Sequence, residues 1–136
     1  MKLLVATDGS KASEGAVKYA ARLFTSIGKG SHITLITVQD DSSLRLFKKY
    51  TQKGSVEDYL REGADTNLAW TVRFLSKANV AHDMSIKFGH PSEQILKEAK
   101  AGGFDMIIMG TKGRSGWADT VLGSVAQRVA GASKVP

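Results

Sequence analysis

Residues 105–128 read DMIIMGTKGRSGWADTVLGSVAQR, and this stretch decides how the rest of the chain is expected to fold. Met106–Met109 is a short apolar run between Asp105 and Gly110, which predicts a strand buried on both faces of a parallel sheet. A glycine-rich loop follows. Helical spacing then begins, with one apolar face formed by Leu122, Val125, Val129 and Ala132. The stretch therefore predicts a strand, a loop and a helix in that order.

The predicted loop has the composition of an anion-binding site. Glycines permit positive φ or a close approach to another group, and the basic side chains add positive charge. Ser124 stands in the first turn of the predicted helix, where free N–H groups and the macrodipole favour phosphate. The alternative is that the glycines only form a turn and Ser124 only caps the helix. The glycines and basic residues are Gly110, Lys112, Gly113, Arg114, Gly116 and Gly123.

The length predicts one domain over residues 1–136, since it is enough for a single core. The composition predicts a cytoplasmic protein. The sequence has no cysteine, which excludes disulfides, thiolate metal sites and cysteine catalysis, and which fits a reducing compartment. The apolar run near the N-terminus is too short for a signal peptide. No stretch approaches the roughly 20 apolar residues of a membrane span.

The net charge of +6 comes from 19 basic and 13 acidic residues, and it keeps nucleic acid under consideration as a partner. The basic residues are spread along the chain, however, and the densest group, in residues 45–53, is interleaved with apolar residues as on a solvated helix. Residues 110–113 also match the Gly-x-x-Gly clamp of some RNA-binding domains. That clamp joins two helices, whereas a strand precedes Gly110, so nucleic acid is not the expected partner.

The remaining sequence alternates strands with helices, which predicts an α/β fold with a doubly wound, parallel, Rossmann-like sheet. In such sheets, ligands bind beyond the carboxyl ends of the strands, where the winding reverses. A short helix is proposed at residues 44–50, and a loop at residues 52–55. Further strands are predicted at residues 3–6, 33–38 and 84–88, and helices at residues 12–27, 55–77 and 91–102. The helix at 12–27 is expected to bury a face that includes Tyr19, and the helix at 55–77 is expected to begin at Ser55, which stands three residues before Asp58 as in a capping box.

If the first and fourth strands flank this switch point, residues far apart in the sequence meet at one crevice. Asp8 is then placed to accept hydrogen bonds from ribose hydroxyls or to hold a divalent cation, although it is equally typical of a turn before glycine. No nucleophile, base and orienting residue stand together, so no catalytic residue is predicted. The histidines fall at opposite ends of the sheet and predict no metal site. The residues expected at the crevice are Thr7, Asp8, Ser10, Val38, Met109 and residues 110–124.

Over nearly its whole length the chain resembles a universal stress protein. The resemblance lies in LLVATDGS at residues 3–10, in GHP at residues 89–91, and in the glycine loop. The spacing Gly110, two residues, Gly113, nine residues, then Gly123-Ser124 resembles that of the ATP-binding branch of the family. The resemblance implies a homodimeric stress-response or signalling module that binds ATP, AMP or ADP, with Mg²⁺ or Mn²⁺ accompanying ATP. Slow ATP hydrolysis or adenylyl transfer is the alternative activity.

The resemblance also implies roles for individual residues. It places Asp8 near the ribose and the backbone of Val38 near adenine, with Gly110 and Gly113 along the path from ribose to phosphate. Lys112 and Arg114 are added here on grounds of charge. Such proteins usually close with a fifth strand after Val-Pro, and this sequence ends at those two residues, so the final strand is expected to be absent from it. Either that strand lies outside this sequence or the sheet ends at the fourth strand, which is then expected to have an open edge. The residues implied to hold phosphates are Gly123, Ser124 and Val125.

Overall fold

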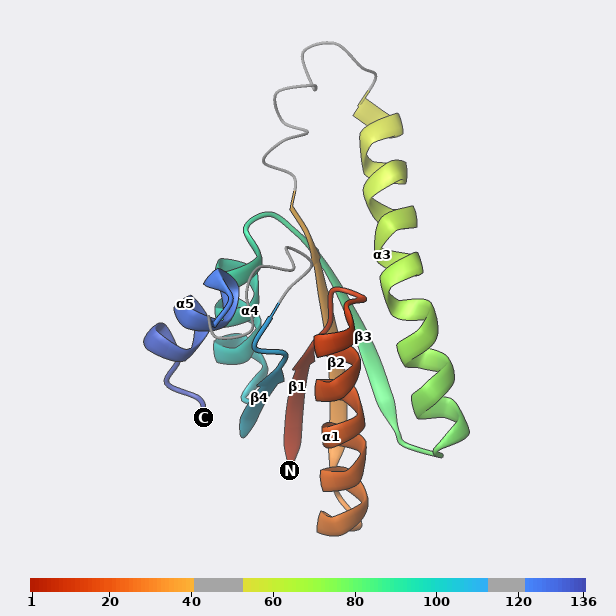
Figure 1. Cartoon of the computed structure of the whole chain (residues 1–136), viewed down its shortest axis with the longest axis vertical. Helices are drawn as coiled ribbons and strands as arrows, with labels where there is room; N and C mark the ends of the chain where they lie inside the picture. Colours follow the sequence, from red (N-terminus) through yellow and green to blue (C-terminus); the bar gives the residue numbers. More distant parts are fainter. Residues whose placement is uncertain (41–52, 113–121) are drawn as a thin grey trace.

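The computed structural model describes residues 1–40, 53–112 and 122–136, with the side chains of residues 53–61 outside the description. These residues form one α/β domain with a four-stranded parallel sheet in the order β3-β2-β1-β4 (Figure 1). This confirms the predicted fold class and the four-stranded sheet. The strands are β1 (Lys2–Ala6), β2 (His32–Gln39), β3 (His82–Phe88) and β4 (Met106–Met109). The described helices are α1 (Lys11–Ile27), α3 (Lys53–Lys77), α4 (Pro91–Gly102) and α5 (Ser124–Ala132).

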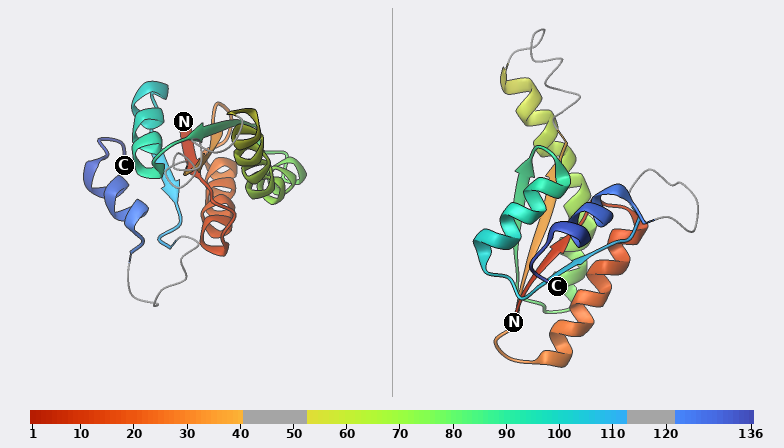
Figure 2. Two further views of the ribbon diagram at one scale, coloured as in Figure 1. Left: turned by 90° about the horizontal axis from the view of Figure 1, so that it is seen from above. Right: turned by 90° about the vertical axis from the view of Figure 1, so that its left-hand side faces the viewer.

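The strand order shows where the winding of the sheet reverses. From β1 the chain passes outward through β2 to β3, and α1 and α3 cover one face along this path. Helix α4 then returns the chain to β4 on the other side of β1, so α4 and α5 cover the second face (Figure 2). Ala6 pairs with Met109, which brings the carboxyl ends of β1 and β4 side by side. The predicted switch point between these two strands is therefore confirmed.

Two apolar cores hold the layers together, one on each face of the sheet. Along β1, Leu3 and Val5 point toward α1 and α3, whereas Leu4 and Ala6 point toward α4 and α5. Because both faces of the central strands are covered, their side chains are almost fully buried. This double burial is the physical reason for the uninterrupted apolar runs that identified these strands in the sequence.

Helix α1 buries a slightly different face from the predicted one. Val17 is fully buried in the core, whereas Tyr19, which was expected on the buried face, is 59% exposed. Tyr19 lies over a groove beside β4, the outermost strand on that side, where no further described strand follows to cover it. The helix begins at Lys11 and ends where the C-cap Gly28 takes a positive φ of 83°.

Helices α3 and α5 also correct the sequence analysis. Helix α5 begins at Ser124 and buries Ala126 and Val129, so that Leu122 precedes the helix and Ala132 is exposed at its end. Helix α3 begins two residues before Ser55, which therefore lies inside the helix and is not its N-cap. The short helix proposed at residues 44–50, and most of the basic segment at 45–53, lie outside the described residues.

The outer edge of β4 is partly paired by the end of the chain. After α5 the backbone returns to the sheet, and the Ile107 N–H donates to the carbonyl of Pro136 over 2.8 Å. The expectation of an open edge on the fourth strand is thus wrong at this residue.

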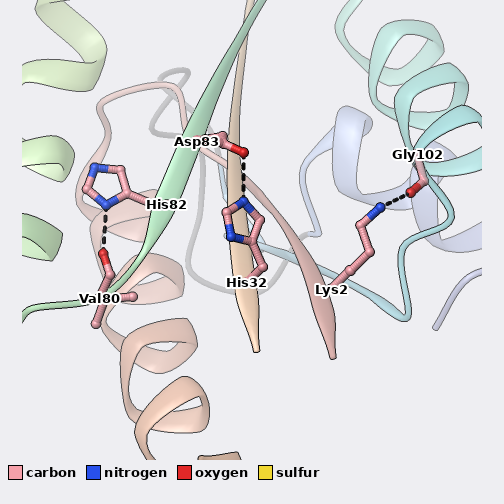
Figure 3. Close-up of polar contacts among 6 residues, drawn as sticks. All are labelled: Lys2, His32, Val80, His82, Asp83 and Gly102. Atoms are coloured by element: carbon pink, nitrogen blue, oxygen red, sulfur yellow. Dashed lines mark hydrogen bonds and ion pairs between the residues drawn. The ribbon is translucent and has the colours of Figure 1, made fainter. Parts of the chain in front are cut away.

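Polar contacts fasten the amino ends of the strands (Figure 3). Lys2 Nζ donates to the carbonyl of Gly102 and so joins β1 to the end of α4. His32 Nε2 lies 2.7 Å from Asp83 Oδ2, and this pair joins β2 to β3. His82 donates through Nδ1 to the carbonyl of Val80 over 2.8 Å. Two histidines therefore lie at this end of the sheet with separate partners, far from the third, at the start of α4.

The packing of α3 on β2 becomes polar toward the carboxyl end of the sheet. Thr37 and Gln39 follow Leu35 on the face that meets α3, where Asn67 and Thr71 are buried. Thr37 Oγ1 and Gln39 Nε2 are buried without a hydrogen-bond partner among the described residues. A buried polar group without a partner costs about 1–3 kcal/mol, so this contact is weaker than its buried area implies.

We expect Thr37→Val to leave the free energy of unfolding unchanged or to raise it by about 1 kcal/mol, because valine has the same shape and removes the unpartnered hydroxyl. Thr7→Val is the matched comparison, since the buried Thr7 hydroxyl contacts Ser13 Oγ and accepts from the Gly9 N–H. This second change should lower the free energy of unfolding by about 1–2 kcal/mol. Urea denaturation of both variants measures the difference, and equal losses would contradict it.

Candidate functional site

A cavity of about 320 Å³ lies at the carboxyl ends of β1, β2 and β4, between the starts of α4 and α5. This volume is within the range of small-molecule sites. The wall is assembled from segments far apart in the sequence. They are the turn after β1, the last residues of β2, residues 109–112, the start of α4 and residues 123–126.

Most of the residues that the sequence analysis proposed for a site meet at this cavity. Lys112, which was added on grounds of charge, also lines it. Gly113 and Arg114 lie outside the described residues. Ser10 does not line the cavity, contrary to expectation, because its hydroxyl caps α1 by accepting the Ser13 N–H over 3.2 Å. The proposed residues that line the cavity are Thr7, Asp8, Val38, Met109, Gly110, Gly123, Ser124 and Val125.

The turn after β1 holds Asp8 at the cavity wall. Asp8 Oδ1 accepts the N–H of Ser10 over 2.9 Å, which fixes the carboxylate within the turn. Behind it, the buried Thr7 hydroxyl lies 3.1 Å from Ser13 Oγ, and Ser13 Oγ donates to the carbonyl of Ser10 over 2.8 Å. The sequence Thr-Asp-Gly-Ser therefore satisfies its own buried polar groups and leaves one carboxylate at the cavity.

Gly9 is required in this turn for two reasons. Its φ of +78° lies in the left-handed region that favours glycine. A Cβ at this position would also lie 3.0 Å from Asn67 Oδ1 and 3.3 Å from Asn67 Cα, so the turn packs closely on α3.

The hydrogen bonds of the turn decide the charge state of Asp8. Partial burial by itself raises the pKa of Asp8, but hydrogen bonds from the side chain and backbone of Ser10 and from Ser13 more than offset it, so the pKa lies below its ordinary value. Asp8 is therefore a carboxylate at neutral pH.

The loop after β4 begins with a glycine that packs against α1. A Cβ on Gly110 would lie 2.8 Å from the carbonyl carbon of Ala12 and 3.0 Å from its Cβ. The sequence predicts either positive φ or close approach at this glycine, and the structure shows a close approach to a helix backbone. One residue further, the carbonyl of Thr111 accepts the Gly123 N–H over 2.7 Å. This bond places the start of α5 directly beside the end of β4.

The start of α5 presents backbone N–H groups at the cavity wall. Gly123 is its N-cap and makes no side-chain capping bond. The first helical hydrogen bond is donated by Gln127 to the Gly123 carbonyl over 2.9 Å, so the helix does not use the N–H groups of residues 124–126. Residues 123–126 all line the cavity. An uncapped helix start with its positive dipole end is suited to an anion.

The opposite wall of the cavity is apolar, formed by Ile36 and Val38 of β2 and by Pro91 and Ile95 of α4. Of these four residues, only Val38 was predicted from the sequence to lie at the site. The missing signals were alternation along β2, which puts Ile36 on the same face as Val38, and the helical spacing of Pro91 and Ile95.

Two charged side chains line the described part of the cavity wall. Asp8 is the acidic residue and Lys112 the basic residue among the described residues that line the wall. The described residues contain no group of three or more His, Asp or Glu side chains suited to hold a metal ion. The cavity thus combines an apolar slot with a polar end, an arrangement that suits a ligand with a flat apolar part and an anionic part.

The fold and the cavity together define a doubly wound α/β domain with a small-molecule pocket at its topological switch point. Residues 1–136 match the model of the universal stress protein family, and the chain belongs to that family. None of the described helices is long and apolar enough to span a membrane.

The chain is similar to universal stress proteins of Methanocaldococcus jannaschii. It is 28% identical to MJ0577 over 99% of this chain and 91% of that protein, and 29% identical to MJ0531 over 94% and 74%. The MJ0577 structure has a TM-score of 0.86 over 99% of this chain and 91% of its own. The chain also shares its fold with a universal stress protein family protein from Arabidopsis thaliana whose structure has AMP bound. The two are 19% identical, and the TM-score is 0.71 over 100% of this chain and 88% of the other.

Asp8→Asn tests the charge state of the carboxylate. Because the pKa of Asp8 is lower in the folded protein, its stabilising contribution is present above the ordinary value of 3.8 and is lost as the pH falls below it. The unfolding free energy of the wild type should therefore fall more steeply than that of the variant below about pH 4. Denaturation curves across this range measure it, and parallel curves would refute the lowered pKa.

Gly110→Ala tests the contact between the loop and α1. We expect it to lower the free energy of unfolding by about 1–3 kcal/mol, because the new Cβ meets backbone that has to shift. Gly15→Ala is the matched control, since a Cβ at Gly15 in α1 meets no atom within 4 Å. The control should raise the free energy by about 0.5–1 kcal/mol. Thermal unfolding of the two variants measures both, and a harmless Gly110→Ala would contradict the contact.

Proposed function

We propose that this chain binds an adenine nucleotide in the cavity and acts as a stress-response or signalling module whose interactions depend on that ligand. The observation that carries the proposal is the uncapped start of α5 facing an apolar slot across one cavity. The homodimer implied by the family resemblance and the cytoplasmic location predicted from the composition form part of the same proposal.

The shape of the cavity suits the parts of a nucleotide in order. The slot between Val38 and Pro91 takes the base, since both side chains are apolar and line opposite elements. Asp8 accepts hydrogen bonds from the ribose hydroxyls, as its ionised carboxylate is suited to do. The phosphates lie at Ser124 and Val125, where the helix start offers N–H groups, with the Lys112 ammonium on the same wall.

The family supports an adenine nucleotide over other anions. Universal stress proteins of this fold include one with AMP bound and another in complex with cAMP. The glycine spacing that ends at Gly123-Ser124 resembles that of the ATP-binding branch, and the first and last glycines of that spacing line the cavity.

A cation bound with ATP would have one ligand from the described wall. Mg²⁺ is usually held by one or two carboxylates together with phosphate oxygens, so Asp8 fits as the ligand that the chain supplies to Mg²⁺ or Mn²⁺. The lowered pKa of Asp8 makes it a weak proton acceptor at neutral pH. This favours binding over ATP hydrolysis or adenylyl transfer as the function.

Ser124→Asp separates nucleotide binding from stability. A carboxylate at the first position of α5 stabilises the helix start, so the free energy of unfolding should hold or rise by about 0.3–1 kcal/mol. The same carboxylate repels phosphate, so ATP affinity should fall by about tenfold or more while adenosine affinity changes much less. Calorimetric titrations with ATP, AMP and adenosine, in the presence of magnesium, measure these changes.

Gln127→Asp is the matched control, because it adds the same charge to an exposed position of α5 that does not line the cavity. It should weaken ATP binding far less than Ser124→Asp. Equal losses of ATP affinity in both variants would show that the phosphates do not bind at the start of α5. Failure of the wild type to bind any of the three ligands would overturn the proposed function.

A further inference from the structure

His90 links the two helices that form the cavity wall. It is the N-cap of α4, directly before Pro91, and its side chain makes no capping bond. Instead, its ring lies between two other partners. Nδ1 is 3.1 Å from Ser92 Oγ, and Nε2 is 3.3 Å from Nη1 of Arg128. Arg128 lies one turn after Ser124 on α5, so the His90–Arg128 contact joins α4 to α5.

The two partners require one protonation state of the ring. Arginine has only donors, so the contact with Arg128 requires an unprotonated Nε2 that accepts. The neutral ring then carries its proton on Nδ1 and donates it to the hydroxyl of Ser92, which is 1% exposed. Protonation adds a hydrogen at Nε2 and leaves the Ser92 contact intact. It therefore removes the Arg128 contact selectively and brings two positive charges together.

We propose that His90 and Arg128 are positioning residues that couple ligand affinity at the cavity to pH. Histidine is the side chain whose charge ordinarily changes between about pH 5 and pH 8. With His90 neutral, the contact holds the start of α4 against α5. With His90 protonated, the contact opens and affinity falls. This inference rests on the proposed nucleotide binding.

The position of the contact explains why it affects the cavity. Further along the two helices, Ile95, Ala99 and Val129 pack in a shared apolar core that does not depend on pH. The polar contact lies instead at the start of α4, and the residues next to it, Pro91 and Ser124, line the cavity. A small change there alters the cavity width without unfolding either helix.

Other charges near this point are few. Lys87 is paired with Glu98 over 3.0 Å. Glu93 lies three positions after His90, which is the spacing of neighbours on a helix surface. Its negative charge is opposite in sign to the positive charge that protonation of His90 adds. Among the described residues, the elements next to this contact carry these charged side chains: Arg128 on α5, Glu93, Lys97, Glu98 and Lys100 on α4, Lys87 on β3, and Asp40 after β2.

The test compares the AMP and magnesium-ATP affinities of wild type and Arg128→Gln at about pH 8 and about pH 5.5. At the higher pH the wild type should bind each nucleotide about two- to fivefold more tightly than Arg128→Gln. At the lower pH the ratio of wild-type affinity to variant affinity should approach one. Titration of the ligand phosphates is common to both proteins and cancels in the ratio. Lys97→Gln, which removes an exposed cation from α4, should give a ratio near one at both values.

A ratio that stays above one at the lower pH would overturn the inference, because it would mean that Arg128 acts on the ligand by charge alone. His90→Asn should abolish the pH dependence of the ratio. An unchanged dependence in that variant would also overturn the inference.

A ligand-free cycle distinguishes failure of this inference from failure of the proposed function. Arg128→Gln should raise the unfolding equilibrium constant about two- to fivefold at about pH 8 in the wild type, but not in His90→Asn. At about pH 5.5 this coupling should vanish. If His90 and Arg128 are coupled in this way but the protein binds no nucleotide, the proposed function is refuted and the pH-sensitive contact between the two residues is supported. Absence of coupling at both values would refute the link, whatever binds.

Discussion

The parallel pairing of β1 with β4 is the constraint on which the site depends. It puts the turn that follows Ala6 beside the loop that follows Met109, although about a hundred residues separate them in the chain. The pairing alone does not build a cavity. Gly110 lets the loop approach the backbone of α1, and the bond between Thr111 and Gly123 then brings α5 to the end of the strand. Each step requires the previous one, because the helix start faces the cavity only when the loop leaves β4 in this direction.

The two faces of the sheet are packed differently toward the carboxyl ends of the strands. On the face of α1 and α3 the core is apolar near the amino ends and polar near the carboxyl ends, where Thr37 and Gln39 keep buried groups without partners. On the other face, α4 and α5 share an apolar core but separate at their starts, and the cavity lies between them. The proposed ligand therefore occupies the place where helix packing is least complete, and its binding energy adds to the stability of that region.

Much of this arrangement was predictable from the sequence, for identifiable reasons. Leu3–Ala6 is buried on both faces, so its apolar character is continuous and unambiguous. Met106–Met109 is equally apolar in sequence, but at the edge of the sheet only Ile108 is buried and the other three residues are half-buried. The glycine spacing marked the residues that meet at the cavity. Tyr19 was misplaced because helical spacing identifies a stripe but not its edges, and which edge is covered depends on where the sheet ends. The contact of His90 with Arg128 left no pattern in the sequence, since it depends on how two helices pack.

We propose that the cavity at the switch point binds an adenine nucleotide with its phosphates at the start of α5. A crystal structure of the protein soaked with AMP tests it most directly. We expect the AMP base to lie between Val38 and Pro91, and its phosphate oxygens to lie about 3 Å from the backbone nitrogens of residues 124–126. An empty cavity at saturating AMP, or AMP bound only in the groove beside Tyr19 and β4, would contradict it.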